Sequence, residues 1–574
     1  MLAEMKQLDT DVLVIGAGLA GITAALWAAR SGARVCITAN GEIGSGSSFY
    51  PGTWGLGLIG PESKEDEADL MEVILEIGEG MADKELVSCL VSGVSEGISE
   101  LKGLGAEVKD AVNKGEREFV PCFDKKCRDW HGIVKEGTRA VLVKALKELD
   151  VELLPCTAIT DILVRDGRIV GAEAVQMGKD SGILFIRCRA AVIASGGLGG
   201  LFSYRLNTPD VTGLGQFLAL KAGASLVNLE FMQMMPGFLH PAPRTIYNEK
   251  VFRYSEFFYP DTGEPVFSDW SREKLEDLME IRSGHGPFTS RLVSREVDIR
   301  LYQEGLKRGE GVILRYQKEL KEGQPEFVQT YFRWLKEKTG LTMDDPVFLG
   351  IFAHASNGGI KIDRQAGTGV NGLFACGEAT GGMHGADRLG GLSTANALVF
   401  GKIAGNHAAR WSLEQKREGE YAEADGKPKG RHLSAKPAGG QRTEICGAAE
   451  LLEKVREINY RTAMVVRREE ALLCGLEEIQ QLQRIGENKR SRLKHQAEPY
   501  AEQPISCWMR YQKTRELEAA FVLSEALLKA ALLRKESRGS HFRLDYPEKK
   551  DDLKKPIISS WGRDGVCTRF LNRV

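Results

Sequence analysis

The stretch DVLVIGAGLAGITAALWAARSGARVCIT, residues 11–38, decides the fold. It begins with a short apolar run that suits a buried parallel strand. A glycine-rich turn, an alanine-rich helical segment and a second apolar strand ending at Thr38 follow. The dinucleotide-binding fingerprint requires this order, because its glycines let the backbone approach a pyrophosphate at a helix N-terminus. We therefore predict a Rossmann-like domain in which Gly16, Gly18 and Gly21 bind a nucleotide cofactor.

The residues after the second strand give less direct information. The strand ends in Thr38, where an acidic residue usually binds the ribose hydroxyls, and the missing acid argues against plain NAD binding. A loop rich in glycine and hydroxyl groups, GSGSSFYPGTWGLGLIG, occupies residues 44–60. A serine-rich surface turn would account for these hydroxyls but would leave Phe49, Tyr50 and Trp54 unexplained.

A second glycine-rich stretch, HASNGGIKIDRQAGTGVNGLFACGEATGGMHGADRLGGLSTANALVFGKIAG, spans residues 354–405. Its glycines surround a few chemically active side chains, among them Glu378 and Arg388, and an apolar helical segment follows. Glycine at this density costs backbone entropy and is tolerated where main chain must lie close to a ligand. We expect the helix that starts near Ser393 to direct its free N–H groups and positive dipole end at a bound ligand, and the electron-rich edge of a flavin would fit there. The alternative is a glycine-rich loop before a core helix.

The composition limits the classes of function. A chain of 574 residues is long enough for about two to four domains. Its net charge of −2 gives no electrostatic case for nucleic acid or an anionic membrane. No run reaches the ~18 apolar residues of a membrane span, and no signal peptide opens the chain. The scattered cysteines form no disulfide framework, which favours a cytoplasmic setting.

The cysteine spacing also bears on metals. Cys122 and Cys127 are the closest pair, without the additional thiolates of an iron–sulfur cluster, which needs about four. We expect no metal site within this chain, although two ligands completed elsewhere remain an alternative.

The motif HxxxGGI followed by GLFACGEATGGMHGADRLGG resembles the flavoprotein subunit of succinate dehydrogenase and fumarate reductase, and L-aspartate oxidase. The similarity recurs in the same order over most of the chain. It implies an α/β FAD-binding Rossmann-like domain with an inserted α+β capping domain and a C-terminal helical domain. We predict FAD-binding parts at 1–232 and 345–412, a capping domain at 233–344, a linker at 413–444, and a helical domain with tail at 445–574.

The resemblance assigns the cofactor as FAD. In succinate dehydrogenases a histidine in the loop at 44–60 bonds covalently to the flavin, and Ser47 stands at the matching position, so we predict non-covalent FAD. Leu214 replaces the acid of the family's TGDG turn, which removes one expected polar contact. The cofactor is expected to contact Gly16, Gly18, Gly21, Thr38, Ser47, Ser48, Gly196, Gly197, Glu378 and Ser393.

The resemblance also assigns the substrate side. In the family, an arginine delivers a proton to one carbon while reduced FAD passes hydride to its neighbour. Arg295 matches that arginine, and His354 and Arg388 match groups that hold a substrate carboxylate. A shifted alignment would choose Arg291 instead, and a third reading places these arginines on an exposed helix face.

One part of the family's substrate site is missing. The family reads EFxQFHPT where this chain reads EFMQMMPG, and its His and Thr bind the second carboxylate of a dicarboxylate. Met235 and Gly237 stand at those positions and offer no useful side-chain donor. The aromatic residues between 247 and 259 either pack a core or line a larger, less polar pocket.

We therefore expect an FAD-dependent oxidoreductase of the fumarate reductase type that acts on a carboxylate-bearing compound other than fumarate or succinate. Two alternatives remain: an L-aspartate oxidase, and an electron-transfer subunit whose flavin passes electrons to a separate iron–sulfur protein. The segment RKESRGSHFRLDYPEKKDD at 534–552 resembles the family's RxESRGxHxRxDYPxxDD, and we predict that it packs the tail on the flavin domain.

Overall fold

The computed structural model describes residues 6–112, 122–178, 181–321, 324–417, 443–492, 505–563 and 565–571. At its centre is a parallel sheet in which the strands are ordered β18 (Leu373–Ala375), β11 (Ala190–Ile193), β2 (Val12–Ile15), β3 (Val35–Thr38) and β7 (Glu152–Leu154). All strands but the edge strand β7 are buried along their whole length, because helices and loops cover both faces. The predicted Rossmann-like domain is confirmed.

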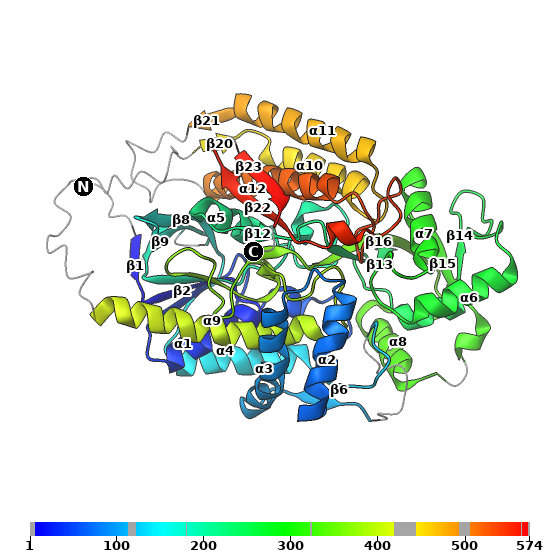
Figure 1. The fold of residues 1–574 in the computed structure, drawn as a ribbon, viewed down its shortest axis with the longest axis horizontal. Coiled ribbons are helices and arrows are strands. Elements are labelled where there is room, and N and C mark those ends of the chain that lie inside the picture. The colour runs from blue at the N-terminus through cyan, green and yellow to red at the C-terminus, as the bar shows by residue number, and fades with distance from the viewer. Residues whose placement is uncertain are drawn as a thin grey trace.

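The helices on this sheet pack with close backbone contact. Helix α1 (Leu19–Arg30) joins β2 to β3, and α9 (Leu392–Arg417) lies along it (Figure 1). A Cβ on Gly405 of α9 would lie 2.3 Å from the Ala24 carbonyl oxygen of α1, so only glycine allows this approach. The neighbouring helices are α2 (Lys64–Ile77), α3 (Lys84–Gly103), α4 (Lys135–Glu148) and α5 (Leu214–Ala222).

Two smaller sheets complete this domain. One has the order β1 (Lys6–Asp9), β10 (Gly182–Arg187), β9 (Arg168–Gln176) and β8 (Thr157–Arg165). The other has the order β4 (Leu56–Gly60), β6 (Asp129–Ile133) and β5 (Val108–Asp110), and it connects the loop at 44–60 to the rest of the domain.

The capping region is built on an antiparallel sheet with the order β13 (Met232–His240), β16 (Val347–Ser356), β15 (Val312–Tyr316) and β14 (Ser255–Phe258). Helices α6 (Arg272–Ser283), α7 (Arg295–Arg308) and α8 (Glu326–Thr339) surround it at one end of the molecule (Figure 1). Strand β16 returns the chain to the flavin domain, so this sheet crosses the predicted boundary at residue 344. The pairing of Gln233 with Ala355 places the EFMQ motif beside His354.

The C-terminal region is helical, as the sequence predicts. Helices α10 (Ala448–Ala463), α11 (Glu469–Asn488) and α12 (Ile505–Leu533) lie on the opposite side of the molecule from α1 and α4 (Figure 1). Strands β20 (Thr443–Ile445) and β21 (Arg490–Arg492) pair beside them. Of the predicted linker, residues 413–417 continue α9 and 443–444 belong to β20, whereas 418–442 lie outside the described residues.

The tail after α12 returns to the flavin domain. Its strands β22 (Ile557–Gly562) and β23 (Gly565–Phe570) form a hairpin in a sheet with β12 (Leu226–Val227), β17 (Gly359–Lys361) and β19 (Thr380–Gly381). Among the described helices, none combines the length and apolarity needed to cross a membrane.

Candidate active site

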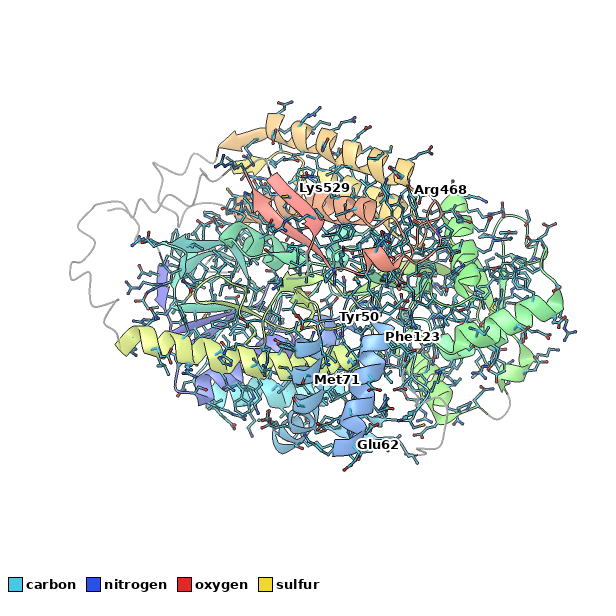
Figure 2. The ribbon with its side chains drawn as sticks, viewed as in Figure 1. Tyr50, Glu62, Met71, Phe123, Arg468 and Lys529 are labelled. Carbon is cyan, nitrogen blue, oxygen red and sulfur yellow. The ribbon has the colours of Figure 1, made fainter. Side chains whose placement is uncertain are left out.

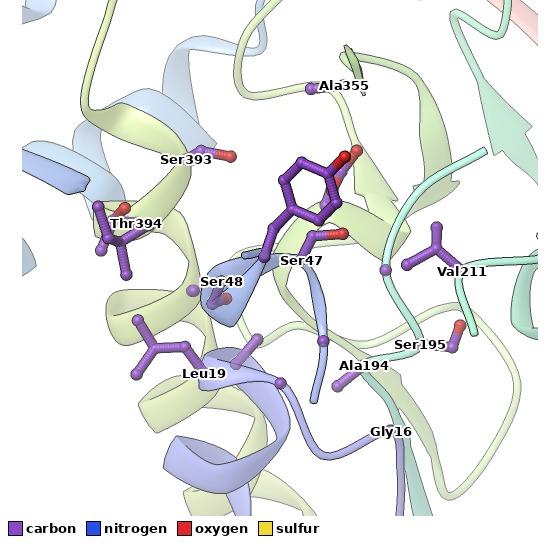
Figure 3. Close-up of a pocket in the computed structure, with 18 of the residues that line it drawn as sticks. Gly16, Leu19, Ser47, Ser48, Ala194, Ser195, Val211, Ala355, Ser393 and Thr394 are labelled. Carbon is purple, nitrogen blue, oxygen red and sulfur yellow. The ribbon is translucent and has the colours of Figure 1, made fainter. Parts of the chain in front are cut away.

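A cavity of about 350 Å³ lies at the carboxyl ends of the central parallel strands. Residues that directly follow β2, β3 and β11 line it, as is usual for ligand sites in open α/β sheets. Figure 3 shows the glycine turn with Gly16 and Leu19, the loop with Ser47 and Ser48, and the start of α9 with Ser393 around this cavity.

The glycine turn has the geometry of a phosphate-binding turn. Gly16 has a φ of +106°, and a Cβ there would lie 2.4 Å from the Ala194 carbonyl oxygen. Gly18 lines the cavity. A Cβ on Gly21 would lie 1.8 Å from the Gly16 carbonyl oxygen, so Gly21 acts by letting α1 start close to the turn. The backbone N–H groups at the start of α1 are therefore open to a phosphate.

An acid that the sequence did not reveal lies near the end of β3. Asp210 lines the cavity, and its Oδ2 accepts a hydrogen bond from the Ser45 hydroxyl at 3.0 Å. Asn40 donates to the Asp210 carbonyl oxygen at 3.5 Å. The other carboxylate oxygen of Asp210 is buried without a partner in the described structure. Asp210 thus offers an acceptor for a cofactor hydroxyl near the place where β3 lacks an acid.

A buried lysine holds the loop at residues 44–60 in place. The Lys135 ammonium donates to the carbonyl oxygens of Tyr50 at 2.6 Å and Thr53 at 2.7 Å, and burial lowers its pKa to about 8. The Tyr50 hydroxyl donates to the Arg244 carbonyl oxygen. Figure 2 shows Tyr50 near the middle of the molecule. The Ser47 hydroxyl is buried without a partner in the described structure, and Ser48 also lines the cavity.

These observations fit FAD. The cavity combines an open phosphate turn, unpaired buried oxygens and the N-terminus of α9, where Ser393 and Thr394 line the wall. Thr38 and Gly196 also line it. Gly197 does not itself line the cavity but lies next to Glu378, since a Cβ on Gly197 would be 2.2 Å from Glu378 Oε1.

The cavity also carries charged groups. His354, Glu378 and Arg388 all line it. Arg388 Nε donates to Gln233 Oε1 at 3.0 Å, so the glutamine of the EFMQ motif orients the guanidinium. Burial lowers the Arg388 pKa, and the Glu378 carboxylate opposes that shift. Burial raises the Glu378 pKa, although the Ser356 amide and the Arg388 charge oppose the shift.

His354 is a neutral hydrogen-bonding group. Burial, and then the charge of Arg388, lower its pKa to about 3. Its Nδ1 is buried without a partner in the described structure. His384, the other histidine of this stretch, has its pKa lowered to about 3 by the same causes, but it does not line the cavity.

The neutral state of His354 predicts a pH profile. A histidine with a folded pKa of about 3 is deprotonated at every pH above about 4, so it contributes no change of charge near its usual pKa of about 6.5. We expect the kcat/KM profile, which reports the free enzyme, to show no inflection from His354 between about pH 5 and pH 8. An inflection near pH 6.5 that disappears in His354→Asn would contradict this assignment.

The wall facing these groups is apolar. Tyr50, Leu206, Met235, Ile246 and Phe352 form one buried cluster, and all but Phe352 line the cavity. A Cβ on Gly237 would lie 3.1 Å from the Thr245 carbonyl oxygen, so a side chain at that position has no room without a shift.

Two further residues that line the cavity, Cys122 and Glu249, were not predicted from the sequence as site residues. The Cys122 thiol accepts a hydrogen bond from the Gly286 amide at 3.2 Å and contacts Glu249 Oε1 at 3.5 Å. Burial raises the Cys122 pKa to about 12, so the thiol stays protonated. Both side chains line the cavity. Their positions depend on tertiary contacts and not on a local motif.

The structure does not bring Arg295 into this group. Arg295 opens α7, and its guanidinium donates to the Ser290 carbonyl oxygen at 2.7 Å and lies 5.7 Å from the Phe542 ring centre. Arg291 also stays outside the cavity wall, because its Nε donates to the buried Asp387 carboxylate at 2.8 Å. Among the described residues, no carboxylate forms an ion pair with Arg295.

The fold and this site define the class of FAD-dependent oxidoreductases. Residues 11–394 match the family model described as the FAD binding domain, and residues 452–566 match the model of the fumarate reductase flavoprotein C-terminus. The chain belongs to the family of fumarate reductase and succinate dehydrogenase flavoproteins and L-aspartate oxidases. The predicted family, fold and FAD cofactor are therefore confirmed.

The relatives and solved structures described next are similar to this chain over nearly their whole length, although the sequence identity is low. The chain is 27% identical to one of the subunits of the fumarate reductase (CoM/CoB) of Methanothermobacter marburgensis, over 97% of this chain and 98% of that protein. It is 27% identical to L-aspartate oxidase of Pyrococcus furiosus, over 95% of this chain and 98% of that protein. A quinol–fumarate reductase solved with menaquinol molecules superposes with a TM-score of 0.77 at 22% identity, over 99% of both chains. This last likeness shows the fold.

Proposed function

We propose that this protein transfers hydride between FAD and the carbon–carbon bond next to the carboxylate of a compound with an apolar far end. One observation supports the proposal: His354 and Arg388 line the same cavity as an apolar cluster that includes Met235, and Arg388 donates to Gln233 on the strand that carries Met235. FAD, when bound, supplies the hydride acceptor or donor. The residues of the chain bind the substrate, orient it and provide the proton.

Arg388 and His354 hold the substrate carboxylate. The Arg388 guanidinium uses its Nε on Gln233, which leaves its terminal nitrogens for charge-assisted bonds to the carboxylate. Neutral His354 adds a hydrogen bond without a second positive charge. Such bonds strengthen as negative charge moves onto the carboxylate in the transition state, and each donor contributes about 2–4 kcal/mol to lowering the barrier.

The apolar wall disfavours a second carboxylate. The family's two donors are replaced by Met235 and Gly237, and a side chain at position 237 would require its neighbours to shift by a few tenths of an ångström. A buried carboxylate left without a donor costs about 1–3 kcal/mol for each missing bond. We therefore propose that fumarate and succinate are poor substrates and that an acid with an apolar substituent binds better.

We propose Arg295 as the proton donor, which requires the first turn of α7 to move inward. Moving Arg295 breaks one bond to a carbonyl oxygen and one ring contact. Moving Arg291 would leave the buried Asp387 carboxylate unpaired, and breaking such a pair costs about 3–5 kcal/mol. Arg295 is therefore the easier of the two guanidinium groups to bring to a substrate.

The substrate proposal is tested by flavin reoxidation. The reduced holoprotein is mixed with fumarate, crotonate and cinnamate, which share an unsaturated bond next to a carboxylate but differ at the far end. We expect cinnamate or crotonate to reoxidise the flavin at least about tenfold faster than fumarate. The control is Met235→Leu, which keeps the wall apolar and should keep the order. Robust turnover of fumarate or succinate would contradict the proposal.

We also propose that FAD is held without a covalent bond. Ser47 stands at the position of the family's linking histidine, and a hydroxyl does not form that bond. The glycine turn, Asp210 and the start of α9 supply the contacts instead. Acid precipitation is expected to release all flavin into the supernatant, and absorbance at flavin wavelengths in the washed pellet would refute this.

We further propose a separate electron-transfer partner, such as an iron–sulfur protein. Two relatives, from Methanothermobacter marburgensis and a Serratia species, are named as subunits of fumarate reductases. The described residues contain no group of three or more His, Cys, Asp and Glu side chains placed to hold a metal. Electrons would therefore leave or reach the flavin through a second protein.

A further inference from the structure

The tail segment Gly539–Phe542 lies between the two parts of the chain that carry Arg388 and Arg295. It belongs to the ESRGSHFR motif that follows α12. Gly539 has a φ of +51°, and a Cβ there would lie 2.5 Å from the Ala386 carbonyl oxygen and 2.6 Å from its carbon. The tail therefore touches the backbone two residues before Arg388.

The contact with Ala386 is made by several donors. The Ser540 amide and hydroxyl both donate to the Ala386 carbonyl oxygen at 3.1 Å. The Asn357 amide group donates to the same oxygen at 3.4 Å. Ala386 and Ser540 are fully buried, so water cannot replace these bonds without opening the site. The position of the loop that carries Arg388 is thus set by the tail.

The same segment holds the capping region. The Gly539 carbonyl oxygen accepts a hydrogen bond from the Ser290 amide at 2.7 Å. The Ser290 carbonyl oxygen in turn accepts the bond from Arg295, whose guanidinium lies 5.7 Å from the Phe542 ring centre. Phe542 is buried, with 4% of its surface exposed. The resting position of Arg295 therefore depends on Gly539 and Phe542.

The tail is itself firmly attached to the flavin domain. Arg534 donates to Glu230 at 2.7 Å, and Arg538 pairs with Glu536 at 2.8 Å; all of these side chains have at most 2% of their surface exposed. The Gly539 amide donates to Glu79 Oε2 at 2.8 Å. Buried pairs of this kind, together with the Glu79 contact, hold the tail against the flavin domain. The segment Gly539–Phe542 is thus fixed against the flavin domain.

We propose that Gly539–Phe542 is a positioning element of the active site. It fixes the loop that carries Arg388, which lines the cavity, and it holds Arg295 in its resting place outside the cavity wall. The sequence motif alone predicts only that the tail packs on the flavin domain. This inference rests on the proposed roles of Arg388 and Arg295 in carboxylate binding and proton delivery.

The test is Gly539→Ala in the FAD-loaded full chain. The added methyl group must push the Ala386 backbone away, and a displacement of about 1 Å in a positioned group lowers rates by about a hundredfold. We expect FAD content to stay at the wild-type level, and the Kd of crotonate, measured from the flavin absorbance change, to rise at least about tenfold. Amide hydrogen exchange should become faster in residues 384–391 and 288–295.

The matched control is Gly263→Ala. Gly263 has a φ of +71°, and a Cβ there meets nothing within 4 Å, so this variant has the backbone strain without the displacement. Its Kd for crotonate and its amide hydrogen exchange rates should match those of the wild type. Equal effects in both variants, or a wild-type Kd and exchange pattern in Gly539→Ala, would overturn the proposal.

Ser540→Ala keeps the proposal testable if Gly539→Ala does not fold. It removes the hydroxyl bond to Ala386 but keeps the amide bond, so we expect a rise in the crotonate Kd of about threefold to tenfold and faster exchange only near Ala386. No change in either measurement would overturn the proposal. If crotonate leaves the wild-type flavin spectrum unchanged, the carboxylate function fails, whereas hydrogen exchange still decides the role of the tail.

Discussion

Replacing Arg388 with methionine is expected to lower kcat/KM for the preferred acid by about a thousandfold while FAD stays bound. Arg388 is the arginine that lines the cavity, and Gln233 orients it through Nε. Methionine fills similar space but offers neither charge nor donors. The substrate carboxylate would then enter a cavity whose remaining charged groups include Glu378 and Glu249, both acidic. The Kd of crotonate and steady-state turnover measure the effect.

Two controls separate the charge from the fold. Arg388→Lys keeps a positive charge but loses the planar fork of donors, so its activity should fall between those of the wild type and Arg388→Met. Arg364 is exposed and outside the cavity, and Arg364→Met should behave as the wild type. Wild-type kcat/KM in Arg388→Met would remove the guanidinium from the mechanism.

Arg388→Met also has a consequence for Glu378. The Arg388 charge is one of the effects that oppose the burial-induced rise of the Glu378 pKa. Without it, the Glu378 pKa rises further, and the fraction of neutral Glu378 increases at a given pH. The flavin spectrum should therefore be compared at several pH values in both proteins, so that a change at Glu378 is not mistaken for lost substrate binding.

The cofactor half of the site could be predicted from the sequence because its signals are local. The glycine turn, with Gly16 and Gly18, is specified by consecutive residues between a strand and a helix, and Ser393 by its place at the start of α9. Asp210 could not be predicted in this way. It comes from a loop distant in sequence and reaches the end of β3 only through the tertiary fold.

Of the three residues expected on the substrate side, two line the cavity and one does not. His354, which lies in β16, and Arg388, which lies in the glycine-rich loop before α9, both line the cavity. Arg295 was expected beside them, and its side chain instead lies on the tail. The contact between Arg295 and Phe542 could not be predicted from the sequence, because the two residues belong to regions that are distant along the chain. The hairpin β22–β23 was also not predicted, because neither of its short strands has a regular alternation of buried and exposed residues.

Arg295→Gln is expected to lower kcat by about a hundredfold to ten-thousandfold, the range of a general acid, while the crotonate Kd stays within about threefold of the wild type. Arg295, the proposed proton donor, does not line the cavity in the resting structure, so its loss is expected to slow proton transfer and to leave the initial binding of the carboxylate unchanged. Single-turnover flavin reoxidation with cinnamate or crotonate measures the rate of the chemical step separately from product release. Unchanged reoxidation would assign proton delivery to another group.

Arg291→Gln is the matched control, and its expected loss is in stability. Burial raises the pKa of Asp387 to about 6, and Arg291 and Thr289 oppose that shift. The folded state therefore holds this proton more tightly than the unfolded state, whose pKa is about 3.9, and stability falls as pH rises from about 4 to 6. Without Arg291 the folded pKa rises further, so the loss continues above pH 6, and near pH 8 the variant is expected to be about 3 kcal/mol less stable than the wild type. Denaturant unfolding at both ends of this range should show a larger deficit at the higher pH, together with near wild-type reoxidation of the folded fraction. A variant that keeps its stability but loses turnover would exchange the roles of Arg291 and Arg295.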